Sequence, residues 1–162
     1  MITVTVSYKE SMSELYGCVP KKETTEITVT GLPYYVDQVS QVPKNTIKEF
    51  ANKYLVETEE QLVDDFIFGY QNVQYIATYL LVTKDSSYPI HNELRMYLSY
   101  DEYRNGVFYQ TVYKARSYRN VSIFTDGTLN LEYDQFPYTS FTDDIAEELT
   151  SLENEYVCMK VD

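Results

Sequence analysis

Three strand-like stretches lie close together between residues 73 and 118, and this pattern limits the fold more than any other feature of the chain. Residues 73–83 are almost continuously apolar or tyrosine, which is typical of a strand buried on both faces. Residues 94–100 alternate in polarity, and residues 107–118 form a further strand after a turn over residues 101–106 that ends in Asn-Gly. Successive strands joined by such short connections predict an antiparallel meander.

Five more segments have the composition of strands. They are residues 2–8, 26–30, 121–125, 128–133 and 156–161. The first two are separated by a polar, irregular segment, so we expect a hairpin with a long connection. The third and fourth flank Asp126-Gly127, a dipeptide that is typical of tight hairpins.

The first helix is predicted after Pro43, where apolar residues recur at the spacing of one helical face. These residues are Ile47, Phe50, Ala51, Tyr54 and Leu55. A second, short helix is predicted to begin with the capping box Thr-Glu-Glu-Gln at residues 58–61. Its buried side would hold Leu62, Val63 and Phe66, and Gly69 would end it.

The third helix is predicted to be capped by Thr142, with Asp143 and Asp144 in its first turn. Ile145, Leu149 and Leu152 would form its buried stripe. The chain of 162 residues then has the order β-β-α-α-β-β-β-β-β-α-β. This order predicts an α+β fold, a single domain over residues 1–162, with a mainly antiparallel sheet and about three helices.

Charge is spread unevenly along the chain. The formal net charge is −12, and residues 120–162 contribute −9, because they hold ten acidic residues and only Lys160 as a base. Such a field repels nucleic acid and anionic membranes and attracts basic partners. No apolar run is long enough to span a membrane, and the strand pattern at residues 2–8 leads us to expect no signal peptide and a soluble, cytoplasmic protein.

Residues that carry common chemistry are few. His91 is the only histidine, and the five glycines form no phosphate-binding loop. Cys18 and Cys158 lie far apart, so the sequence leaves open whether they pair. Asp64-Asp65, Asp101-Glu102 and Asp143-Asp144 are the adjacent acid pairs, and acids at helix starts have a structural role. We therefore expect no enzyme and predict neither a cofactor nor a metal site.

Basic and aromatic residues interleave in the middle of the chain. They are Arg95, Arg104, Lys114, Arg116 and Arg119, with Tyr97, Tyr103, Tyr109, Tyr113 and Tyr118. Such a sheet face could bind single-stranded nucleic acid, but the charge of the whole chain opposes this. We expect no direct nucleic-acid binding; an exposed strand pair with cross-strand contacts, or contact with a second copy, is the alternative.

The last third carries the candidate site, an acidic face that we expect to bind a partner. Asp143 and Glu147, like Asp144 and Glu148, are four residues apart, which on a helix gives a spacing close to that of successive phosphates. The predicted acidic face consists of Asp143, Asp144, Glu147, Glu148, Glu132, Asp134 and Asp126. A secondary acidic patch is predicted from Glu57, Glu59, Glu60, Asp64 and Asp65.

In small size, acidity and tyrosine content, the chain is similar in character to the nucleic-acid mimics of phages and mobile elements, although no motif is shared. The leading hypothesis is a non-enzymatic binding protein for the basic surface of a nucleic-acid-binding protein. Its sharpest form is a viral inhibitor that blocks a restriction or CRISPR effector in the host cytoplasm. The alternatives are an assembly protein that forms homo-oligomers through a Tyr-rich sheet, and a carboxylate- and metal-dependent enzyme.

Overall fold

The computed structural model describes residues 2–7, 24–131 and 138–162, which fall into two compact units. The first unit covers Met1–Pro33 and contains the hairpin of β1 (Ile2–Ser7) and β2 (Thr24–Val29). These strands pair antiparallel, with Ile2 opposite Val29. The hairpin with a long connection that the sequence predicts is therefore confirmed.

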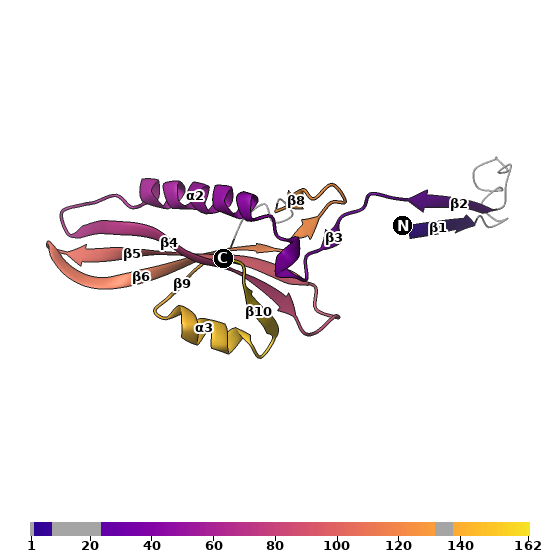
Figure 1. Cartoon of the computed structure of the whole chain (residues 1–162). Helices are drawn as coiled ribbons and strands as arrows, with labels where there is room; N and C mark the ends of the chain where they lie inside the picture. Colours follow the sequence, from indigo (N-terminus) through magenta and orange to yellow (C-terminus); the bar gives the residue numbers. More distant parts are fainter. Residues whose placement is uncertain (1, 8–23, 132–137) are drawn as a thin grey trace, which may run out of the picture. The chain divides into compact units, whose positions relative to one another are not determined.

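The second unit covers Tyr34–Asp162 and holds all the other elements (Figure 1). In chain order they are β3 (Tyr34–Tyr35), the 3-10 turn η1 (Val39–Gln41), α2 (Lys44–Gln61), β4 (Phe68–Thr83), β5 (Asn92–Arg104), β6 (Val107–Arg119), β7 (Ser122–Ile123), β8 (Leu129–Asn130), β9 (Tyr138–Thr142), α3 (Ile145–Leu152) and β10 (Tyr156–Lys160). The α+β class is confirmed.

Five strands of the second unit form one antiparallel sheet in the order β10-β4-β5-β6-β9. The central meander β4-β5-β6 is the one that the sequence predicts, but β5 extends to Arg104. The turn between β5 and β6 is therefore only Asn105-Gly106, and both residues have a positive φ, as a type I′ hairpin turn requires. The smaller sheet β3-β7-β8 contains the hairpin predicted around Asp126-Gly127.

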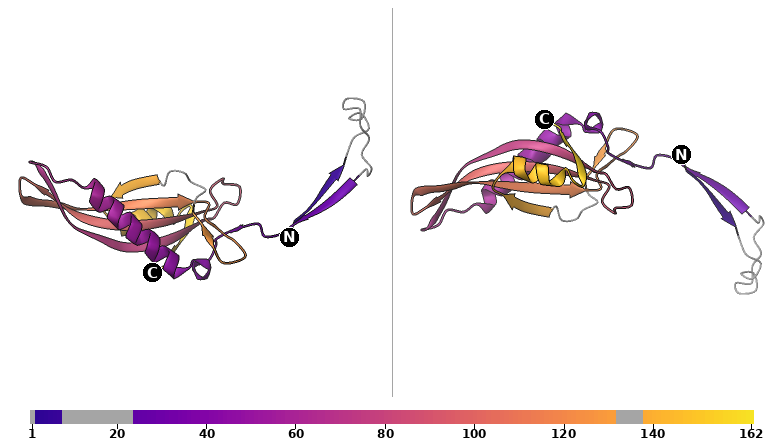
Figure 2. Two further views of the ribbon diagram at one scale, coloured as in Figure 1. Left: turned by 90° about the horizontal axis from the view of Figure 1, so that it is seen from above. Right: turned by 90° about the horizontal axis from the view of Figure 1, so that it is seen from below.

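Helix α2 covers one face of the five-stranded sheet (Figures 1 and 2). Its buried residues recur at the spacing of a single helical face, and the cluster they join is almost entirely apolar. The members of this core are Val36, Val42, Ile47, Tyr54, Leu80, Leu94, Met96, Leu98, Tyr118, Val121, Ile123, Leu131 and Val161. Burial of these side chains holds the helix on the sheet.

The prediction of a second helix from residue 58 is wrong. Thr58 is fully buried in the last turn of α2, and its carbonyl accepts a hydrogen bond from the amide of Leu62. The buried stripe of Ile47, Ala51 and Tyr54 continues to Thr58, and no residue between them breaks the helix. The segment after Gln61 is a loop in which Val63 and Phe66 are exposed instead of buried, so the described residues contain two α-helices and not three.

Helix α3 lies on the opposite face of the sheet (Figures 1 and 2). It begins at Ile145, two residues later than predicted, because the side chain of Asp144 caps it by accepting bonds from the amides of Ala146 and Glu147. Asp143 and Asp144 therefore precede the helix and do not lie in its first turn. Neither α3 nor any other helix in the described ranges is long and apolar enough to cross a membrane.

We predict that Thr58→Val raises the free energy of unfolding by up to about 1 kcal/mol. The Thr58 hydroxyl is buried and has no hydrogen-bond partner, so removing it relieves an unsatisfied polar group. Chemical denaturation of both proteins measures the change. If Thr58 were a helix cap, the same substitution would instead destabilise the protein by about 1 kcal/mol. Thr142→Val, which removes a hydroxyl that bonds the Asp144 backbone, is the matched control and should destabilise.

Candidate interaction surfaces

A buried network of charges lies beneath α3. Arg95 on β5 is 8% exposed, and its guanidinium pairs with both Glu93 of the same strand and Glu148 of α3. Arg95 also donates to the Ser117 hydroxyl, and Arg119 lies 3.6 Å from Glu93. Because Glu93 is itself 3% exposed, the guanidinium compensates two carboxylates in a region that water barely reaches.

Two further cations are buried on the other face, beneath α2. Arg116 pairs with Glu57 of α2, and its guanidinium carbon lies 4.0 Å from the centre of the Tyr54 ring. Lys114 donates to the side chain of Gln61 at 3.0 Å. Burial lowers the pKa of Lys114, and the charge of Arg116 lowers it further.

The basic and aromatic residues of β5 and β6 therefore do not form the exposed face that the sequence suggested. Arg95, Lys114 and Arg116 lie inside the fold, and the helices cover them from opposite sides. Successive side chains of a strand point to opposite faces of the sheet, and this alternation places Arg95 on one face and Arg116 on the other. A surface for stacking nucleic-acid bases is thus absent from these three positions.

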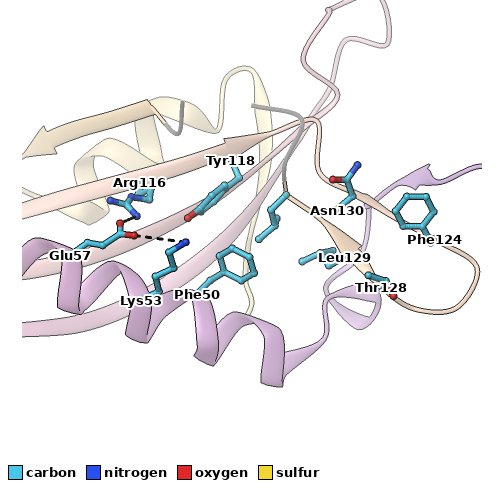
Figure 3. Close-up of a pocket in the computed structure, with 10 residues that line it drawn as sticks. Phe50, Lys53, Glu57, Arg116, Tyr118, Phe124, Thr128, Leu129 and Asn130 are labelled. Atoms are coloured by element: carbon cyan, nitrogen blue, oxygen red, sulfur yellow. Dashed lines mark hydrogen bonds and ion pairs between the residues drawn. The ribbon is translucent and has the colours of Figure 1, made fainter. Parts of the chain in front are cut away.

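A hollow of about 630 Å³ opens between α2, β6 and the β7–β8 hairpin (Figure 3). Phe50 and Tyr118 line it together with residues of the hairpin. Glu57 also lines the hollow, next to the cations Lys53 and Arg116. Glu57 pairs with Arg116 and lies 3.9 Å from Lys53. The charges that line the hollow thus pair with one another, and Glu57 of the predicted secondary patch is bound to these cations.

The residues of the predicted acidic face have different surroundings. Asp143 and Glu147 are exposed, Asp144 caps α3, and Glu148 is bound to the buried Arg95. Asp126 accepts the amide of Thr128 in the hairpin turn, and this bond lowers its pKa. Glu132 and Asp134 lie outside the described residues. The helical spacing predicted for Asp143 with Glu147 is not present, because Asp143 precedes the helix.

The secondary acidic patch is likewise divided. Glu59 and Glu60 are exposed in the last turn of α2. Asp64 accepts the amide of Tyr70 at 2.8 Å, and Asp65 accepts the amides of Ile67 and Phe68. Because α2 and α3 cover opposite faces of the sheet, the structure does not combine the patch on α2 with the acidic residues around α3 (Figure 1).

The start of β4 and the turn from β5 to β6 lie at the same end of the sheet (Figures 1 and 2), and exposed apolar residues gather on these segments. We call this group of residues the aromatic tip. It consists of Val63, Phe66, Ile67, Val107, Phe108 and Tyr109. The α2–β4 loop and the β5–β6 turn meet there, since the amide of Asn105 donates to the carbonyl of Ile67 at 2.8 Å.

A tight turn displays Phe66 at this tip. The Asp65 carboxylate accepts the amides of Ile67 at 2.7 Å and Phe68 at 2.6 Å, and the amide of Asp65 donates to the carbonyl of Phe68 at 2.8 Å. These bonds close the backbone around Phe66, whose side chain is 97% exposed. The acid pair Asp64-Asp65 therefore builds a turn, and sequence analysis missed the tip because Val63 and Phe66 were assigned to a helix.

No known sequence family, curated protein or solved structure matches this chain. Within the described ranges, no group of three His, Cys, Asp or Glu side chains could hold a metal ion. His91 stacks on Tyr35 with ring centres 4.3 Å apart. The features that bear on function are therefore the surfaces of the chain itself.

We predict that Arg95→Met destabilises the fold by about 3–5 kcal/mol, because the buried Glu93 then keeps only Arg119 at 3.6 Å and the partly buried Glu148 loses its ion-pair partner. Thermal unfolding should show a lower Tm and should reveal partial recovery when Glu93→Gln and Glu148→Gln are added. Arg104→Met, on the same strand but with an arginine side chain that is 45% exposed, is the control and should cost about 1 kcal/mol or less. Equal losses for the two single variants would contradict the buried network.

A second prediction concerns pH at the tip. The amides of Phe68 and Ile67 lower the pKa of the Asp65 carboxyl group in the folded protein. Its stabilising effect on the turn is therefore complete above the ordinary pKa of about 4, and it is lost as the pH falls through the lower pKa of the folded state. Amide NMR signals of Ile67 and Phe68 should titrate with a midpoint below about 4. In Asp65→Asn this transition should vanish. A midpoint above the ordinary value would refute the assigned bonds.

Proposed function

We propose that this protein is a non-enzymatic binding protein that recognises a basic surface on a partner protein. The observation that carries the proposal is the sorting of charge between the interior and the surface. Three cations of the central strands are buried, whereas acidic residues remain exposed around α3. The exposed members of this group are Asp143, Glu147, Glu153 and Glu155.

The exposed carboxylates are suited to a charged partner. None of the four forms an ion pair with another residue of the described ranges. Two of them, Glu153 and Glu155, follow α3 at its C-terminal end, where the helix dipole disfavours negative charge. Charge placed against local stability is expected at a functional surface, and a basic partner would compensate it.

The sharpest form of the proposal is an inhibitor that occupies the nucleic-acid groove of a basic host nuclease. The acidity of residues 120–162 supports it, since such grooves are lined by Lys and Arg that bind phosphates. In this form the partner would be a restriction or CRISPR effector. The exposed acidic side chains would take the places of phosphates, without the regular helical spacing that the sequence suggested.

The test uses Asp143→Lys combined with Glu147→Lys, because these exposed side chains can be changed without breaking the cap at Asp144 or the pair at Glu148. Protein immobilised on beads captures partners from a lysate of the source cell at low and moderate salt. We expect the variant to lose a basic partner that wild type retains at low salt, because like charges then face each other. Mass spectrometry identifies what is retained.

Two controls make the result specific. Asp37→Lys with Glu49→Lys produces the same change of net charge at exposed positions away from α3 and should retain the partner. Added DNA or RNA should displace a nucleic-acid-binding partner from wild type if the nuclease form of the proposal is right. Retention of the partner by the Asp143 and Glu147 variant would exclude the α3 side as the binding surface.

A further inference from the structure

The aromatic tip is not explained by the fold or by the acidic surface around α3. Phe66, Val63 and Val107 are 97%, 72% and 69% exposed, so in the described part of the chain little covers them. Single exposed apolar residues are ordinary, but several of them on two adjoining loops at one end of the sheet indicate an interaction surface. The exposed residues of the tip are therefore a candidate site for binding another molecule.

The backbone that carries the tip is held in place before any partner binds. Asp65 fixes the turn around Phe66, Asp64 fixes the start of β4, and Asn105 joins the β5–β6 turn to the loop. The side chain of Arg104 lies over the Tyr109 ring at 3.5 Å and so contacts another aromatic residue of the tip. A backbone that is ordered before binding lowers the entropy cost of forming an interface.

The surroundings of the tip determine the chemistry of the occupant. An acidic collar, formed by Glu59, Glu60, Asp64 and Asp65, borders the apolar residues. Arg104, a cation at the tip, forms an ion pair with Glu102 at 2.9 Å. The two charges cancel, so this pair does not offset the negative charge of the collar. The collar favours a surface of opposite charge, and it disfavours a second copy of this chain, whose collar would have the same sign.

We propose that the aromatic tip is the anchor of the interface, with Phe66 inserted into an apolar pocket that is flanked by Lys and Arg on the partner protein. The choice of a basic partner rests on the proposed function. The tip and the acidic residues around α3 would make two separate contacts with it. Apolar burial then supplies affinity that salt weakens little, and the collar supplies orientation and salt-dependent association.

The experiment replaces Phe66 by a photoreactive residue in the full chain. Phe66→p-benzoylphenylalanine is irradiated in a lysate of the source cell, and the cross-linked peptide is sequenced by mass spectrometry. We expect an adduct within an apolar pocket whose neighbours include Lys or Arg. Tyr88→p-benzoylphenylalanine is the control, because Tyr88 is an exposed aromatic residue in the loop at the other end of β4. It should not give this adduct.

Affinity for the cross-linked protein, once purified, provides the second measurement. Phe66→Ala should weaken binding by about 30-fold or more, as loss of an interface anchor does. Its Tm should stay that of wild type, since the side chain is almost fully exposed. Phe124→Ala, at an exposed phenylalanine on the β7–β8 hairpin, should bind like wild type.

Several results would overturn the anchor. They are adducts confined to a second copy of the chain, adducts in a polar or acidic surface, adducts only with lipid, or an affinity of Phe66→Ala within about 2-fold of wild type. The same measurements test the proposed function independently of the anchor. If Phe66→Ala abolishes binding and the Asp143 and Glu147 variant does not, the tip is the interface and the α3 side is not. The reverse pattern retains the proposed function and refutes the anchor.

Discussion

The rest of the second unit depends on the burial of β5 on both faces. Every residue from Asn92 to Tyr100 is buried, so both faces of the sheet need a cover at this strand. Helix α2 supplies it on the apolar face. On the other face α3 is short, with only eight residues, and the ion pair between Glu148 and Arg95 adds to its apolar contacts. Both helices thus combine apolar contacts with an ion pair to a buried arginine of the sheet, Glu57 to Arg116 for α2 and Glu148 to Arg95 for α3.

This arrangement changes how the acidity of the chain should be understood. A net charge of −12 suggests a uniformly negative surface, but some of the carboxylates are used to bury cations or to close turns. Glu148 and Asp144 have roles in the fold, whereas their neighbour Glu147 is exposed and forms no ion pair in the described ranges. Acidic residues that are adjacent in the sequence thus have different surroundings.

The sequence predicted the elements whose signals are local. Alternation and turn residues located the meander, the two hairpins and the last strand, because side-chain period and φ requirements act within a few residues. Strands β3 and β9 were missed, since each is short and is defined by its pairing with a distant strand. Residues 58–61 match a capping box, but Thr58 is buried as the next residue of the buried stripe of α2, so the helix continues through it.

The candidate surfaces were harder to predict than the fold. Charge alone pointed to the acidic residues around α3, but it could not distinguish Glu147, which is exposed, from Glu148, which pairs with the buried Arg95 beneath α3. The aromatic tip was not predicted at all. Val63 and Phe66 have the composition of a buried helix face, and only the position of the loop relative to the β5–β6 turn leaves them exposed.

The turn around Phe66 also separates the shape of the tip from its charge. The Asp65 side chain contributes a single oxygen atom that accepts two amide bonds, and asparagine offers an equivalent oxygen without the negative charge. Related chains could therefore exchange Asp for Asn at this position and display the same aromatic side chain under a different electrostatic field. The charge beside Phe66 can thus change while the backbone that presents it stays the same.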